Sequence, residues 1–149
     1  MDALGWYVSF HYTGVQWGIY VPVSGIAYLI SRVFVGLSAS LETKARLAFH
    51  AIFNHELFHF ATDYAIAQAE LMHREPWCLP ARKAFRAGTP RYCVVEEKLA
   101  NAHMLFAFRS TKSALRVKGK QAELRKFVLQ QPEGYRDALG VGPQHIDCL

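Results

Sequence analysis

The sequence predicts an α+β protein in which a small N-terminal β-sheet packs on a long central helix and two or three further helices follow. The first third of the chain is uncharged from Ala3 to Ser31 and is punctuated by turn residues. Between Gly36 and Pro76 there is neither glycine nor proline, as in a long helix. The 149 residues, 52% of them hydrophobic, are enough for one domain with a real core and exclude a disordered or collagen-like chain.

The N-terminal region, residues 1–36, is expected to form the sheet. Residues 6–12 and 15–23 are rich in aromatic and β-branched side chains, which favours two strands on either side of a Thr13-Gly14 turn. Residues 26–35 form either a third strand or the start of a helix.

The uncharged stretch is also long enough to cross a bilayer. It is punctuated by Gly14, Gly18, Pro22 and Gly25 and contains scattered polar side chains, as in buried strands joined by turns. We therefore expect no membrane span.

The cysteines favour a reducing compartment. Cys78, Cys93 and Cys148 are odd in number and form no CxxC pair, so neither a disulfide framework nor a thiolate zinc site is expected. The start of the chain has no positively charged segment before an apolar run, which argues against a secretory signal. A cytoplasmic protein is the simplest interpretation.

A helix over residues 40–73 is expected to lie at the centre of the domain. Ser40 is a suitable N-cap, and Glu42 falls in the first turn, where a negative charge is favourable. The apolar side chains cover more than one face of this helix, which predicts burial on several sides.

Beyond this helix, prolines and a glycine predict a loop over residues 75–92, with one short turn at 81–86. Residues 94–109 have the apolar spacing of a packed helix. Residues 113–130 predict a basic amphipathic helix that is disturbed at Gly119, and a turn-rich tail follows.

Within the central helix the sequence His55-Glu56-Leu57-Phe58-His59 matches the HExxH pattern. Residues i and i+4 share one helical face, with β-carbons about 6 Å apart, so both imidazoles can bind one ion. Glu56 can then take a proton from a water that the ion activates and pass it to a leaving amine. Three ionisable groups in so apolar a helix are costly unless a cation compensates them, which favours a zinc site over a chance match.

Such a site needs a third protein ligand. The extended metzincin pattern is excluded, because Thr62 and Ala65 occupy the positions where it requires glycine and histidine. His73 would lie about 21 Å from the histidine pair along a continuous helix, too far to coordinate. The best donors are Glu96 and Glu97, which open the next helix, and one of them should face the pair.

The run from His55 to Tyr64 matches HELxHxxTDY and resembles the active-site helix of thermolysin-like zinc peptidases. The run from Glu97 to Asn101, with a hydrophobic and a small residue before the asparagine, resembles the third-ligand helix of the gluzincins. The resemblance implies a single minimal zincin-like metallopeptidase domain over residues 1–149. In it, 40–73 is the active-site helix, and the third-ligand and basic helices lie within 94–130.

Carried over by position, the resemblance implies a Zn²⁺ ion bound by His55, His59 and Glu97, with Glu56 as the general base. Glu97 is preferred to Glu96 because the residues that follow it then fit the family pattern. Asp63 and Asn101 would accept hydrogen bonds from the ligand imidazoles and so fix their tautomers.

The second helical domain that usually closes the cleft of thermolysin-like enzymes and supplies oxyanion donors would not fit in the 52 residues given after Glu97, so we expect a compact form. For an oxyanion donor we consider Tyr92 first, then His103 and His145.

The expected function is zinc-dependent endopeptidase activity on a protein or peptide substrate, which could pair as an extended strand with the edge of the sheet near residues 19–23. A second interpretation starts from residues 74–126, which hold 13 basic and 4 acidic side chains. The basic region 109–126 could bind an acidic or nucleic-acid partner, although no known nucleic-acid motif accompanies it. A third interpretation is a zinc-stabilised interaction module without catalysis, against which the presence of Glu56 argues.

Overall fold

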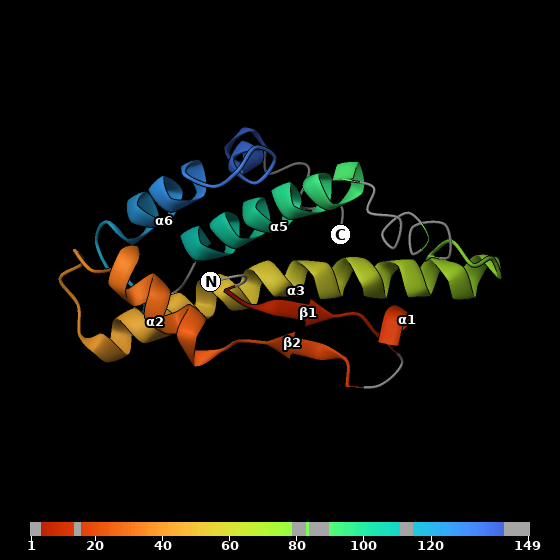
Figure 1. Ribbon diagram of the computed structural model, residues 1–149, viewed down its shortest axis with the longest axis horizontal. Helices are drawn as coiled ribbons and strands as arrows, with labels where there is room; N and C mark the ends of the chain where they lie inside the picture. The colour runs from red at the N-terminus through yellow and green to blue at the C-terminus, as the bar shows by residue number, and fades with distance from the viewer. Residues whose placement is uncertain (1–3, 14–15, 79–82, 84–89, 111–114, 142–149) are drawn as a thin grey trace.

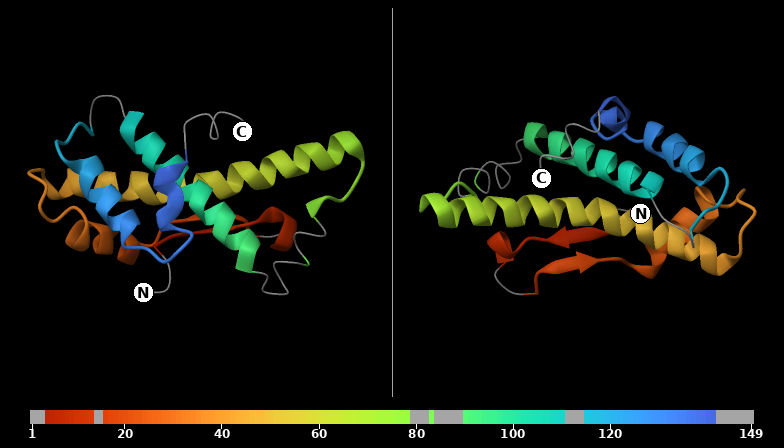
Figure 2. Two further views of the ribbon diagram at one scale, coloured as in Figure 1. Left: turned by 90° about the horizontal axis from the view of Figure 1, so that it is seen from above. Right: turned by 180° about the vertical axis from the view of Figure 1, so that it is seen from behind.

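The computed structural model describes residues 4–13, 16–78, 83, 90–110 and 115–141. They form the predicted α+β fold, in which the long helix α3 is the middle layer. A two-stranded hairpin lies along one side of α3, and α5 crosses its other side (Figures 1 and 2). In chain order the elements are β1 (Trp6–Val8), α1 (Phe10–Thr13), β2 (Gly18–Tyr20), α2 (Val23–Arg32), α3 (Leu41–His73), α5 (Pro90–Ser110), α6 (Lys120–Leu129) and the 3-10 helix η1 (Arg136–Gly140).

The hairpin is shorter than predicted. Strands β1 and β2 pair antiparallel with Tyr7 opposite Ile19, but each has three residues, so the prediction of strands over 6–12 and 15–23 was wrong in extent. The chain leaves β1 because the Ser9 hydroxyl accepts a hydrogen bond from the backbone N–H of His11 at 3.2 Å, which starts the helical turn α1. The predicted turn includes Gly14, which lies outside the described residues.

Most of the segment 26–35, for which the sequence allowed either a third strand or the start of a helix, is helical. Helix α2 begins at Val23, directly after Pro22, whose extended backbone forms the N-cap. A close backbone contact fixes its first turn, since a β-carbon at Gly25 would lie 2.0 Å from the carbonyl oxygen of Leu4. Only glycine allows the chain before β1 to pass so close to α2.

Helix α3 confirms the predicted long central helix. Its N-cap is Ser40, whose side chain accepts a hydrogen bond from the Thr43 backbone N–H at 3.2 Å, and it ends at Arg74 in the left-handed conformation. It packs against the hairpin, α2 and α5 and is buried on several sides. Such packing explains why its apolar side chains are not confined to one face.

The C-terminal helices differ from the prediction at their starts. Helix α5 begins at Pro90 rather than at 94, which suits a residue whose missing N–H costs nothing in a first helical turn. Helix α6 begins only at Lys120, because Gly119 adopts a positive φ of 85° as its N-cap, so the predicted helix over 113–130 was too long. The turn predicted at 81–86 falls, apart from residue 83, outside the described residues.

One hydrophobic core joins the helices. Its largest fully buried side chains come from α2 and the turn after it, α3, α5 and α6: Leu29, Phe34, Leu47, Phe108, Leu124 and Val128. This core lies toward the N-terminal half of α3, so the middle of that helix, with the HExxH residues, sits between the hairpin and α5 at its margin. No helix in the described ranges combines the length and the apolar character needed to cross a bilayer.

Candidate metal centre

The structure brings the two histidines of HExxH together with the predicted third ligand. His55 and His59 lie one turn apart on α3, on the side that faces α5, and Glu97 reaches them from α5. One donor atom from each of these three side chains lies within 4.8 Å of the other two. The packing of α5 on α3 therefore assembles a set of two nitrogens and one carboxylate oxygen.

The distances suit a tetrahedral ion. The Nε2 atoms of His55 and His59 are 3.3 Å apart, which is the separation of about 3.3–3.4 Å that two nitrogens have when both bind zinc at about 2.0–2.1 Å. One carboxylate oxygen of Glu97 lies 2.9 Å from His55 Nε2, and the other lies 3.7 Å from His59 Nε2. Glu97, rather than Glu96, is thus the carboxylate that faces both Nε2 atoms.

The tautomer of His55 is fixed by Asn101, as the family resemblance implied. The side-chain oxygen of Asn101 lies 2.9 Å from His55 Nδ1. The amide cannot be reversed, because its Nδ2 donates to the carbonyl oxygen of Tyr135 at 3.2 Å, and a carbonyl only accepts. His55 Nδ1 therefore carries a proton, and its Nε2 presents a lone pair to the centre of the site.

For His59 the orienting partner is Glu96, which differs from the prediction. Its carboxylate oxygen accepts a hydrogen bond from His59 Nδ1 at 2.6 Å, so the lone pair of this ring also lies on Nε2. The sequence left Glu96 as the alternative third ligand. Because Glu96 directly precedes Glu97 on α5, its side chain reaches Nδ1 of His59, whereas Glu97 faces Nε2 of the same ring.

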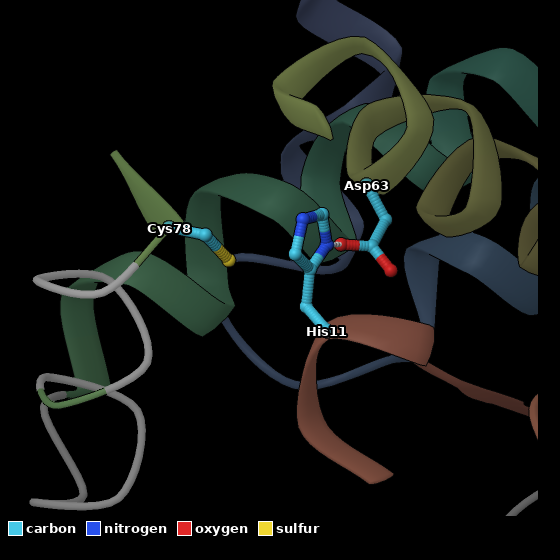
Figure 3. A group of neighbouring side chains, drawn as sticks. All are labelled: His11, Asp63 and Cys78. Atoms are coloured by element: carbon cyan, nitrogen blue, oxygen red, sulfur yellow. Dashed lines mark hydrogen bonds and ion pairs between the residues drawn. The ribbon is translucent and has the colours of Figure 1, made fainter. Parts of the chain in front are cut away.

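Asp63 does not accept a hydrogen bond from His55 or His59, so the role predicted for it was wrong. Its carboxylate accepts hydrogen bonds from the Tyr7 hydroxyl at 2.7 Å and the Ser9 hydroxyl at 2.6 Å. Figure 3 shows its contact with Nδ1 of His11. These partners tie the hairpin and α1 to α3. Asp63 lies one turn beyond His59, but its polar contacts all point toward the N-terminal segment.

The donor set calls for a cation. Two imidazole lone pairs and one carboxylate converge, and none of the three can donate a hydrogen bond to the others when both rings are neutral. A metal ion fits this arrangement, and without one a proton must take its place. Burial opposes a charge on His59, but its hydrogen bonds to Glu96 and Glu97 outweigh that and raise its pKa to about 10. Burial is likewise outweighed at Glu97, whose pKa is lowered to about 2 by His55 and His59.

Glu56 lies beside this centre on the hairpin side of α3. It is 6% exposed, and the backbone N–H of Tyr7 in β1 donates a hydrogen bond to its carboxylate. Burial raises the pKa of Glu56, and the nearby imidazoles of His55 and His59 offset only part of this rise. A raised pKa makes the carboxylate a stronger base than an exposed glutamate.

A glycine permits the strand to lie against Glu56. A β-carbon at Gly5 would lie 2.4 Å from the Ile52 side chain and 3.3 Å from a carboxylate oxygen of Glu56. The absence of a side chain there lets β1 approach α3 closely enough for the Tyr7 hydrogen bond to form. The side chains of the candidate ligands His55, His59 and Glu97 keep between 13% and 24% of their surface exposed, so solvent reaches the site.

Of the three side chains considered for the oxyanion, only that of His103 lies in the described part of the chain. His103 is engaged elsewhere, because its Nδ1 donates to the carbonyl oxygen of Asn54 at 2.9 Å and its ring packs on Phe58. The side chain of Tyr92 and the whole of His145 lie outside the described residues. His73, at the end of α3, stacks on Trp77 and is remote from the histidine pair.

The described part of the basic region has fewer free cations than its sequence suggests. Lys120 is buried, with its ammonium group 4.9 Å from the centre of the Phe108 ring. Lys126 forms an ion pair with Glu123 at 2.8 Å. Residues 111–114, which include Lys112, lie outside the described residues.

Comparisons with known proteins add no relative. No protein-family model, no curated protein and no solved structure matches this chain significantly. The case for a function therefore depends on the motif and on the geometry of this site.

Proposed function

We propose that the protein is a zinc-dependent endopeptidase of the gluzincin type in a compact form. The observation that carries this proposal is the convergence of His55 Nε2, His59 Nε2 and the Glu97 carboxylate, all acceptors, beside the buried carboxylate of Glu56. Three protein ligands leave one coordination position for water or substrate, as in catalytic rather than structural zinc sites.

A zinc ion held by these residues supplies a positive charge that polarises the scissile carbonyl and lowers the pKa of water toward about 7. Glu56 acts as the general base, taking the proton of the attacking water and returning it to the amine of the leaving peptide. Asn101 and Glu96 hold the two imidazoles in the tautomer that binds the ion, and the Tyr7 N–H holds the base beside it.

The substrate is proposed to bind as an extended segment along the hairpin. Within the described residues β2 pairs with β1 along one edge and has no strand on its other edge, where a substrate would form main-chain hydrogen bonds over three residues. This edge is shorter than the strand predicted over 15–23, so most of the binding would have to come from side-chain pockets.

The cytoplasm is the proposed compartment, since reduced cysteines suit the spacing seen in the sequence. Two other functions have less support. Nucleic-acid binding through the basic region is weakened by the engagement of Lys120 and Lys126. A zinc-stabilised module without catalysis has less support because a structural zinc site needs no general base, whereas Glu56 is a buried carboxylate beside the candidate ligands.

The test combines metal analysis with an assay on a mixed peptide library read by mass spectrometry. Zinc-loaded wild-type protein should cleave peptides, and Glu56→Gln should retain the ion with cleavage reduced by about 10²–10⁴-fold. Equal cleavage by wild type and Glu56→Gln, or none by either, would refute the peptidase proposal.

A further inference from the structure

A second cluster of metal-binding side chains lies near the other end of the hairpin. It consists of His11 from α1, Asp63 from α3 and Cys78 from the turn after α3 (Figure 3). One donor atom from each lies within 4.8 Å of the other two, and none of the three belongs to the set around His55. Asp63 and Cys78 are buried, and the side chain of His11 is 15% exposed.

In this cluster, as in the first site, carboxylate oxygens lie against the nitrogens of an imidazole. Both ring nitrogens of His11 face carboxylates, since Nε2 lies 3.3 Å from an oxygen of Glu70 and Nδ1 contacts Oδ1 of Asp63. A neutral imidazole has a proton on only one nitrogen, so the lone pair of the other nitrogen faces a carboxylate oxygen. Two acceptors in contact need a cation between them, either a proton or a metal ion.

Asp63 is held ready for such a cation. Its Oδ2 accepts hydrogen bonds from the hydroxyls of Tyr7 and Ser9, and its Oδ1 is the oxygen turned to His11. A carboxylate with one oxygen fixed by donors and the other directed at an imidazole has the support typical of a metal ligand.

The sulfur of Cys78 completes the set. The backbone N–H of Cys78 donates to the second carboxylate oxygen of Glu70, so one glutamate both orients the imidazole and positions the cysteine. Thiolate, imidazole and carboxylate together are ligands for zinc or a metal of similar preference and not for Mg²⁺ or Ca²⁺.

We propose that His11, Asp63 and Cys78 form a second divalent-metal site of the zinc class. It fastens α1 and the turn after α3 to the C-terminal half of α3, one helical turn beyond His59. The proposal does not depend on peptidase activity, because it uses different ligands and includes a thiolate.

Cobalt titration of the metal-free protein, in a reducing buffer that contains no thiol, tests this site separately from the first. Wild type should bind two equivalents of Co²⁺ and show the near-ultraviolet charge-transfer absorption of a thiolate bound to cobalt. Cys78→Ser should bind one equivalent and lose that absorption. His55→Ala should also bind one equivalent but keep the absorption, which separates the two sites.

The other cysteines are matched controls, since Cys93→Ser and Cys148→Ser should keep the thiolate absorption. His11→Gln retains the sulfur and should weaken cobalt binding at this site at least tenfold, which gives a second result if Cys78→Ser does not fold by circular dichroism. Wild type that shows no thiolate absorption, or absorption that persists in Cys78→Ser, would overturn the proposal. If a proton alone occupies the cluster, the absorption is absent while the first site still binds one Co²⁺.

Discussion

The side-chain amide of Asn101 donates to the carbonyl oxygen of Tyr135 at 3.2 Å, and this single contact decides which atom of the amide faces the histidine pair. It links α5 to the segment before η1, so the C-terminal part of the fold helps to set the tautomer of His55, the proposed zinc ligand on α3. Removing the amide should therefore affect metal binding from a position that does not touch the ion.

Two substitutions at this position should differ. Asn101→Ala leaves His55 Nδ1 without its acceptor, and zinc affinity should fall about 10–100-fold. Asn101→Asp keeps an acceptor for His55 but sets a carboxylate against the Tyr135 carbonyl, so it should lower the free energy of unfolding by about 1–3 kcal/mol. Zinc titration and urea unfolding of both variants check this, and equal zinc affinities would argue against the orienting role.

The adjacent glutamates should have separable roles. Glu97→Ala removes a ligand and should abolish tight zinc binding at this site. Glu96→Ala should leave the ion bound but weaken the affinity about 10–100-fold, because His59 loses its orienting carboxylate. Titration with a zinc-sensitive dye measures both affinities. The reverse order, with Glu96→Ala losing the ion, would show that the ligand assignment is wrong.

Zinc binding should release a proton. In the metal-free protein at pH 7 His59 is protonated, since its pKa is raised to about 10, and Glu97 is ionised, since its pKa is lowered to about 2. The ion must displace the proton on His59, so affinity should rise about tenfold for each unit of pH between 7 and 10. Calorimetry in two buffers of different ionisation enthalpy should detect about one proton released for each ion. Affinity that does not change with pH would contradict this reading of His59.

The close approach of β1 to α3 should tolerate no side chain at Gly5. Gly5→Ala should destabilise the fold by about 1–3 kcal/mol, because the added methyl group meets Ile52 at 2.4 Å and the Tyr20 carbonyl at 3.2 Å. Gly36→Ala is the matched control, since a β-carbon there has nothing within 4 Å. Thermal unfolding of the two variants measures the difference, and equal stability would show that β1 does not press on α3.

Helix α3 and the first site were predictable because their signals are local. The N-cap at Ser40, the long run without glycine or proline and the i, i+4 histidines all act within a few residues. Glu97 was predictable because a family pattern specifies the residues that follow a ligand. Asn101 lies four residues after it and therefore returns to the same face of α5.

The parts that sequence could not supply depend on contacts between distant segments. The hairpin ends early because Ser9 and His11 turn toward Asp63, more than fifty residues away. The same contacts remove Asp63 from the role predicted for it. Cys78 gave no sequence signal, since a lone cysteine acquires partners only when α1 and the turn after α3 are brought together.

The most direct test of the first site is a crystal structure with diffraction data collected on both sides of the zinc absorption edge. The account predicts an anomalous peak bonded to Nε2 of His55, Nε2 of His59 and a carboxylate oxygen of Glu97, at about 2.0–2.2 Å from each. A zinc-supplemented crystal with no anomalous density between these side chains, or with a zinc ion that Glu97 does not touch, would contradict it.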